Sequence, residues 1–313
     1  MRLALHSTEG RLKPYPPFDF DKSMEFVAGF APTQKDHKPA IGEFTRALSI
    51  GGQVVAFQLT STGSVEEPEL QYRLLSEQPL DDDASRKALE RIAFYLSLDD
   101  DLEPFYRIGR EDPLFAPVVE RLYGYHQVKL MSPFEAGCWA VLTQRNAMSE
   151  ARKMRTVLVK RYGGSIEVEG TLHWAFPEAA HLAVANPSDL GAIADNERKG
   201  DYLQALARAF DDVSEEFLLS APYAEVEAWL RGIKGVGEWT AAFILLRGLG
   251  RTERVPMEKH TLTAISRVYG GGKALSEAEA KELAGRYGAW QGYWAHYLRA
   301  ASQVAPASVA RPA

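Results

Sequence analysis

The sequence predicts an α+β protein in which a small N-terminal domain, built from an antiparallel β-sheet and one helix, precedes an all-α domain. Short β-like runs separated by Gly-Gly, Pro and Ser/Thr clusters fill the first 80 residues, which is typical of an antiparallel sheet. From Asp82 onward, apolar residues recur at helical spacing, and several segments stop at glycine, a common helix C-terminus. The predicted domains are residues 1–80 and 81–303.

The individual elements follow from the same patterns. One helix is expected at 19–30, and strands are expected at 46–52, 53–63 and 70–76. The helical segments of the second domain are expected at 84–98, 114–123, 132–144, 150–163, 201–210, 222–233, 238–250, 257–270, 276–288 and 291–304. Residues 304–313 are expected to form a disordered tail.

Composition excludes several classes of protein. The 313 residues are 46% hydrophobic and 25% charged, as in an ordinary globular chain. No run approaches the roughly 18 consecutive apolar residues that span a membrane, and the first residues are too polar for a secretory signal; we therefore expect a cytoplasmic protein. Cys138 is the single cysteine. It argues against disulfides, Cys-based zinc sites and a Cys-ligated iron–sulfur cluster.

Charge is distributed unevenly along the chain. The formal net charge is −6, yet residues 144–162 carry six bases against one acid, and residues 231–273 carry eight bases against three acids. The acidic residues concentrate between 77 and 103. This asymmetry is expected of one anion-binding face on an acidic body, although solvated helix faces give the same pattern.

The most informative motif is the segment 230–241, Leu-Arg-Gly-Ile-Lys-Gly-Val-Gly-Glu-Trp-Thr-Ala. A predicted helix enters a turn with three glycines, and a second apolar helix begins directly afterwards. Backbone N–H groups at such a helix start have no partner within the helix and attract phosphate without regard to base sequence. An ordinary glycine-rich turn is the alternative interpretation.

The run GIKGVGEWTA resembles the helix-hairpin-helix of the helix-hairpin-helix DNA glycosylase superfamily, and most resembles its AlkA-type 3-methyladenine branch. The hairpin is expected at about 225–248, with Lys234 where the family usually has proline. Residues 14–30, 132–163 and 287–301 are also similar to segments of that branch. The resemblance implies base excision repair by a monofunctional glycosylase that hydrolyses the N-glycosidic bond of flipped-out alkylated bases in duplex DNA.

The catalytic residue implied by the resemblance is Glu258. The family pattern V-D-x-H-V-x-R-x-x-x-R is similar to the run that starts at Val255, and matching His260 and Arg267 to its histidine and last arginine puts Glu258 at the position of the catalytic aspartate. A carboxylate there stabilises an oxocarbenium-like transition state or orients water. Because glutamate is longer than aspartate, a catalytically impaired lesion-binding or abasic-site-binding protein is the alternative, in which Glu258 only favours a helix N-terminus.

The expected base pocket is aromatic. Trp239 and Phe243 are spaced i, i+4 and share a helix face, and the resemblance adds Tyr293 from the last helix. Aromatic faces bind cationic alkylated bases, although such residues can equally be core. Family members that also cut the strand carry a lysine where this chain has Trp239, so the resemblance implies no Schiff base and no lyase activity.

The remaining expectations concern DNA. The residues expected to contact the DNA backbone are Gly235, Val236, Gly237, Thr240 and Lys234. The residues expected at the minor groove, as a wedge that fills the gap in the base stack, are Gln144 and Arg145. The resemblance implies no cofactor apart from a monovalent cation at the hairpin carbonyls. The expected partner is damaged double-stranded DNA, bound by a monomer in the cytoplasm at the nucleoid. A helical protein-interaction domain unrelated to DNA conflicts with the hairpin and the basic clusters.

Overall fold

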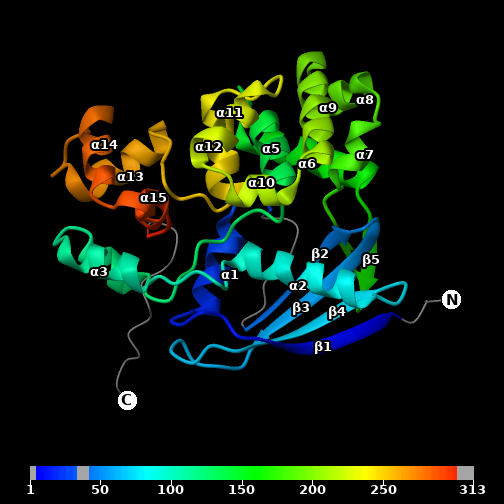
Figure 1. The fold of residues 1–313 in the computed structure, drawn as a ribbon, viewed down its shortest axis with the longest axis horizontal. Helices are drawn as coiled ribbons and strands as arrows, with labels where there is room; N and C mark the ends of the chain where they lie inside the picture. The colour runs from blue at the N-terminus through cyan, green and yellow to red at the C-terminus, as the bar shows by residue number, and fades with distance from the viewer. Residues whose placement is uncertain (1–4, 34–41, 302–313) are drawn as a thin grey trace.

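The computed structural model describes residues 5–33 and 42–301 and contains a four-stranded antiparallel sheet near its N-terminus (Figure 1). The strand order is β1-β4-β3-β2. Between β2 and β3, Gly51 and Gly52 both have positive φ, 57° and 78°, which suits a two-residue hairpin turn. The four strands are β1 (His6–Leu12), β2 (Glu43–Ile50), β3 (Gln53–Ser61) and β4 (Leu70–Ser76).

Helices make up most of the rest, and each of the ten predicted helical segments overlaps one. Side-chain caps explain several starts: Asp81 accepts from the backbone N–H of Ala84, and Ser132 from that of Glu135. The helices are α1 (Phe20–Gly29), α2 (Asp82–Leu96), α3 (Glu103–Glu111), α4 (Ala116–Arg121), α5 (Pro133–Thr143), α6 (Met148–Tyr162), α7 (Ala179–Ala183), α8 (Pro187–Ile193), α9 (Glu197–Asp212), α10 (Glu215–Ser220), α11 (Tyr223–Gly232), α12 (Glu238–Phe243) with the π-helical η1 (Ile244–Gly248), α13 (Lys259–Tyr269), α14 (Glu277–Gly285), the 3-10 turn η2 (Gly288–Trp290) and α15 (Gln291–Ala300).

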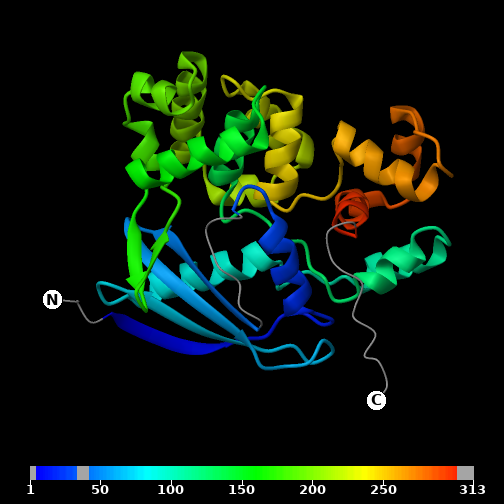
Figure 2. The same ribbon diagram turned by 180° about the vertical axis from the view of Figure 1, so that it is seen from behind.

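The expectation of an all-helical second domain is wrong at one place. Strands β5 (Ser165–Val168) and β6 (Thr171–Trp174) form a hairpin, and it lies against the N-terminal sheet (Figure 2). Ile166 and Val168 are buried there against residues of the sheet. The strands are only four residues long, which is too short for a clear period-2 signal.

The hydrophobic cores do not follow the predicted boundary at residue 80. One core contains residues of α1, the sheet and α2 together with residues of α13–α15 at the other end of the chain. The second core lies among α5, α9, α11 and α12. The fold class is confirmed, but the N-terminal segment and the C-terminal helices share one interior. The predicted tail, 304–313, lies outside the described residues.

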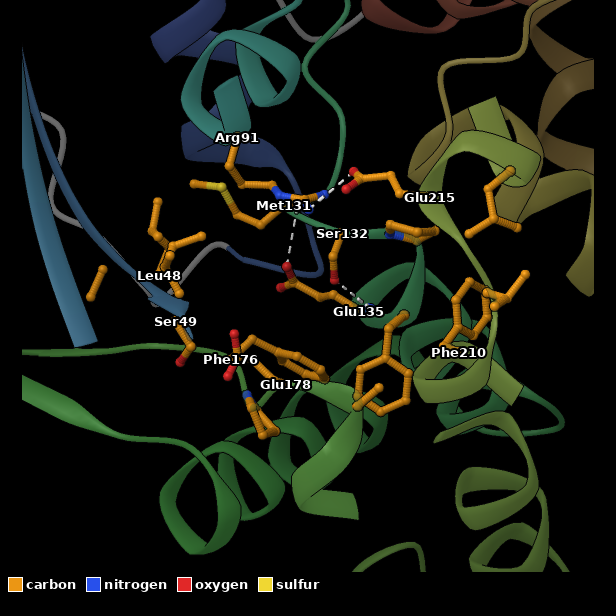
Figure 3. Close-up of a pocket in the computed structure, with 18 of the residues that line it drawn as sticks. Leu48, Ser49, Arg91, Met131, Ser132, Glu135, Phe176, Glu178, Phe210 and Glu215 are labelled. Carbon is orange, nitrogen blue, oxygen red and sulfur yellow. Dashed lines mark hydrogen bonds and ion pairs between the residues drawn. The ribbon is translucent and has the colours of Figure 1, made fainter. Parts of the chain in front are cut away.

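Helix α5 joins the N-terminal sheet to the helical layer. Its residues 134–142 are all buried, and Glu135 in its first turn meets two arginines from other elements. Arg155 Nη2 of α6 lies 2.6 Å from Glu135 Oε1, and Arg46 Nη2 of β2 lies 3.3 Å from the same oxygen. The backbone N–H of Met131 donates to Oε2 at 3.2 Å (Figure 3). One buried carboxylate therefore links the sheet to the helical layer.

Cys138 is free and buried on α5, as expected, and burial raises the pKa of its thiol. Within residues 5–33 and 42–301, no helix has both the length and the apolar character that crossing a bilayer requires.

We expect Glu135→Gln to lower the free energy of unfolding by about 3–5 kcal/mol, because two buried guanidinium groups lose this carboxylate. The matched control is Glu150→Gln, since Glu150 pairs with Lys153 on the surface; its effect should stay within about 0.5 kcal/mol. Urea denaturation of both variants measures the difference. Equal effects would show that the buried cluster does not hold the layers together.

Candidate active site

A cavity of about 270 Å³ lies between α1, α12 and α15. Five phenylalanine and tryptophan side chains line it, and they come from three distant parts of the sequence. The aromatic residues lining it are Phe26, Phe30, Trp139, Trp239 and Phe243. Sequence reasoning missed the first three of these residues. The short apolar segment that contains Phe26 and Phe30 gives no sign that α1 reaches a pocket formed by the helical layer.

Trp239 and Phe243 lie on one face of α12, as their spacing predicts. Their rings are stacked, with centroids 5.4 Å apart and an interplanar angle of 27°. Both residues are only partly buried and both line the cavity. They are therefore open to a planar ligand rather than closed inside the core.

Glu258 also lines this cavity, at the N-cap position of α13. Its carboxylate makes no capping bond to the helix, so the alternative of a simple N-terminal acid does not describe what the side chain does. Instead, Trp239 Nε1 donates to Oε2 at 2.8 Å, and Arg299 Nη1 donates to Oε1 at 3.1 Å. The Glu258 side chain is 24% exposed. A carboxylate is thus held at the edge of an aromatic cavity.

The prediction that Tyr293 lines the pocket is wrong. Tyr293 is 2% exposed, and its hydroxyl donates to the Asp100 carboxylate. The residues of α15 that line the cavity are Ala295, His296 and Arg299, which share a face at spacings of three and four. Tyr293 lies on a different face of α15 and packs in the core. Which residues of α15 face the cavity depends on how this helix is rotated about its axis when it packs. The sequence pattern alone does not determine that rotation.

The floor of the cavity is a buried polar network that the sequence did not indicate. Arg247 Nη1 lies 3.0 Å from His296 Nδ1, and His296 Nε2 lies 2.8 Å from the Tyr125 hydroxyl. Since a guanidinium only donates, Nδ1 accepts and the imidazole is neutral. Burial lowers the pKa of Arg247 to about 10 and, with the nearby guanidinium groups, holds the pKa of His296 well below its usual range. The guanidinium also lies over the ring of Phe30, 4.8 Å from its centroid.

The predicted hairpin forms the turn between α11 and α12. Gly235 has a φ of +90°, and a Cβ there would lie 2.2 Å from the Tyr202 ring, so glycine is required by the fold itself. Gly237 has no such constraint, because a Cβ at that position would meet nothing within 4 Å. The first bond within α12 runs from the Ala241 N–H to the Gly237 carbonyl. The N–H groups before it point out of the helix start.

Two of the predicted backbone contacts, Val236 and Thr240, need correction. The Val236 N–H donates to the Ile233 carbonyl inside the turn, and its side chain is 6% exposed in the core. Thr240 is 3% exposed. Lys234 is exposed but forms an ion pair with Asp201 at 2.8 Å. The open donors of the hairpin are therefore main-chain groups at the start of α12 rather than Val236 or Thr240, and the contact of Lys234 stays a prediction.

Gln144, one of the two predicted wedge residues, fastens the hairpin to α5. Its Nε2 lies 3.0 Å from the Gly235 carbonyl oxygen and 3.3 Å from Thr240 Oγ1. Inserting Gln144 into a base stack would break both hydrogen bonds. Arg145 is exposed and has a φ of +55°, so it remains the residue of this pair that is available at the surface.

A second cavity, of about 290 Å³, lies at the opposite end of α5 (Figure 3). Its charged groups are engaged within the protein: Arg91 pairs with Glu215, and Glu178 accepts from the N–H groups of Gly51 and Gly52. The described residues contain no group of three or more His, Cys, Asp or Glu side chains placed to hold a metal ion. The first cavity is thus the candidate site.

The neutral, buried His296 predicts a loss of stability in acid. The unfolded chain takes up the proton near the ordinary imidazole pKa of about 6.5, whereas the folded protein does so only at a much lower pH. The free energy of unfolding that the neutral His296 contributes is fully present above pH 6.5. It is lost as the pH falls toward the pKa of the folded state, and the loss is about 1.4 kcal/mol at pH 5.5. The measurement is urea denaturation at pH 7.5 and 5.5, in which His296→Gln should show a smaller drop than the parent chain. The exposed His181→Gln is the control, and an equal drop in all three proteins would contradict the assignment.

No protein-family model matches the chain. The DNA-3-methyladenine glycosylase of Bacillus subtilis (strain 168) is 29% identical over 257 residues, which are 81% of this chain and 84% of that protein. The 3-methyladenine DNA-glycosylase from Archaeoglobus fulgidus has a similar structure, with a TM-score of 0.76 at 23% identity, covering 93% of this chain and 97% of the other.

A third similarity extends to another branch of the same fold. The 8-oxoguanine glycosylase/lyase of Clostridium acetobutylicum, in a complex with double-stranded DNA, has a TM-score of 0.68 at 16% identity and covers 95% of this chain and 96% of that one. The likeness of these structures establishes the fold. These sequence relatives and structural neighbours support the resemblance of the chain to the helix-hairpin-helix DNA glycosylase superfamily and to its AlkA-type 3-methyladenine branch.

Proposed function

We propose that this protein is a DNA glycosylase of base excision repair that hydrolyses the N-glycosidic bond of flipped-out alkylated bases, of the 3-methyladenine type, in duplex DNA. The observation that carries the proposal is the Glu258 carboxylate at the edge of the aromatic cavity. The sequence relative of Bacillus subtilis, named a DNA-3-methyladenine glycosylase, supports the same activity. The lesion-binding alternative is not favoured, because the carboxylate is turned toward the cavity rather than onto its own helix.

The base would enter the cavity beside Trp239 and Phe243. An alkylated purine often carries positive charge, and aromatic faces bind such a ring by stacking and cation–π attraction. Unstacking costs least for a damaged base, which adds selectivity. Once the base is in place, the sugar lies at the cavity mouth. There Glu258 stabilises the positive charge that develops at C1′, or orients the water that attacks it.

The DNA backbone would bind at the start of α12. The N–H groups of Gly237 and Glu238 lie where the helix dipole favours an anion. The open space beside the Gly237 Cα lets a phosphate approach the main chain. The exposed Arg145 and the basic residues of α6 would add phosphate contacts, and binding should weaken with salt.

The proposed enzyme is monofunctional and uses water as its nucleophile. No lysine of the described chain lines the cavity, and Trp239 occupies the position at which strand-cutting family members carry the amine. Lys234, nearby in sequence, is paired with Asp201. We therefore expect base release without cleavage at the abasic site.

A monovalent cation at the hairpin is part of the same proposal. Neutral carbonyl oxygens suit such an ion, and those of Ile233 and Gly235 each accept one hydrogen bond and keep a second lone pair. The ion would add positive charge near the bound phosphate. We also propose that the protein acts as a monomer, without another cofactor, on DNA at the cytoplasmic nucleoid.

The first experiment measures base release from methylated duplex DNA at low salt, with the parent protein and Glu258→Gln at equal concentration. The parent should free methylated adenine, and the variant should be at least about 100-fold slower, because the amide removes the charge but keeps the shape. Alkali treatment after the reaction reports base loss, and omitting alkali reports strand cleavage.

Each outcome of this experiment is informative. Strand cleavage without alkali would contradict the monofunctional mechanism. Equal rates for the parent and Glu258→Gln would remove Glu258 from catalysis. A parent protein that binds abasic-site duplex yet frees no base from methylated DNA would overturn the proposed activity in favour of lesion binding.

The two hairpin glycines should respond differently to alanine. Gly237→Ala should fold normally but bind abasic-site duplex about tenfold more weakly, because a methyl group would stand where phosphate approaches. Gly235→Ala should instead lose about 2 kcal/mol of stability, from its positive φ and the contact with Tyr202. Fluorescence anisotropy and urea denaturation separate the two effects. Normal affinity of the Gly237 variant would argue against DNA contact at the start of α12.

A further inference from the structure

The carboxylate of Glu258 is held from two sides by residues of two other helices. Trp239 on α12 donates to one oxygen at 2.8 Å, and Arg299 on α15 donates to the other at 3.1 Å. Glu258 itself precedes α13. Three elements that are separate in the sequence thus meet at one carboxylate, and we call Trp239, Glu258 and Arg299 the carboxylate clamp.

The two donors are themselves restrained. The Trp239 ring stacks on Phe243 one turn further along α12, which limits its rotation and therefore the direction of its N–H. Arg299 follows the buried residues Tyr297 and Leu298 of α15, so its backbone is fixed although its side chain is 47% exposed. The position of the carboxylate is determined by these supports together with the start of α13.

The carboxylate clamp matters because the Glu258 side chain is long. Glutamate has one more methylene than aspartate and one more rotatable bond, so an unsupported glutamate samples more positions. Shortening it to aspartate withdraws the carboxylate by about 1.5 Å along the side chain, which takes it out of hydrogen-bonding distance of both donors as they stand. A displacement of about 1 Å in such a site can cost on the order of 100-fold in rate.

We propose that Trp239 and Arg299 are positioning residues that hold the long side chain of Glu258 at the reacting sugar, so that this site requires glutamate and no longer functions well with aspartate. The inference rests on the proposed function for its catalytic consequence. The clamp geometry has its own readout in the free protein, namely the indole N–H of Trp239.

The geometric arm uses the free protein. In a ¹⁵N-labelled protein, the indole N–H signal of Trp239, assigned by its loss in Trp239→Phe, should exchange slowly with solvent. Glu258→Asp should shift this signal and speed its exchange, because the acceptor moves away. An unchanged signal would overturn the clamp, whatever the enzyme activity.

The catalytic arm measures single-turnover base release from methylated duplex. Glu258→Asp should be on the order of 100-fold slower than the parent. Trp239→Phe, which keeps a ring but removes the donor, and Arg299→Met should each be about tenfold slower, with Arg299→Lys partly restoring the rate. In the Glu258→Asp background, the Trp239 and Arg299 changes should add little, because the contacts they remove are already lost.

Two controls separate positioning from general damage. Affinity for abasic-site duplex should stay within about twofold in Glu258→Asp, Trp239→Phe and Arg299→Lys, since these changes keep the charge of each side chain and no base occupies the cavity there. Arg286→Met is the matched arginine control, because Arg286 is exposed and pairs with Glu282 on α14, and its rate should equal that of the parent.

The outcomes distinguish this inference from the proposed function. A parent protein that releases no base, with a protected indole N–H that responds to Glu258→Asp, would overturn the activity while the clamp stands. An active parent with an equally active or faster Glu258→Asp variant would overturn the positioning role. If the Trp239 and Glu258 changes multiply each other's effects on the rate of base release, the two residues act independently. That result would also overturn the positioning role.

Discussion

The hydrogen bond from the Trp239 indole to the Glu258 carboxylate joins the hairpin helix to the start of α13, and the arrangement of the candidate site depends on it. On one side, the same indole stacks on Phe243 and forms a wall of the cavity. On the other, the carboxylate meets Arg299 from the last helix. This hydrogen bond thereby ties a charged group and an aromatic surface to one short helix, α12.

That arrangement needs a rigid support, which α5 provides from inside the helical layer. Its N-terminal turn holds Glu135 between two buried arginines from different elements. Its C-terminal end presents Gln144 to the hairpin carbonyl of Gly235. The helix is buried along its middle, so a displacement at one end would be transmitted to the other. The sheet, the hairpin and the cavity are therefore held by one element.

The two hairpin glycines show how local and external constraints differ. Gly235 is required by its own backbone conformation and by the Tyr202 ring. At Gly237 no neighbouring atom excludes a Cβ, and the lack of a side chain leaves the surface open. The pattern Gly-x-Gly in the sequence treats the two positions alike. Only the environment of each Cβ distinguishes Gly235, which shapes the turn, from Gly237, which leaves the surface of the turn open.

The sequence by itself determined the elements whose signals are local: the ten helical segments, the hairpin glycines, the shared face of Trp239 and Phe243, and the carboxylate at position 258. It could not determine which faces meet, because helical periodicity defines an apolar stripe without naming its partner. Tertiary packing alone turned Tyr293 into the core and His296 toward the cavity. It also brought Phe26 and Phe30 from the N-terminal segment to the site, and placed Arg299 beside Glu258, 41 residues away in sequence. Contacts at such separations depend on how whole helices pack, and no residue pattern within one segment encodes them.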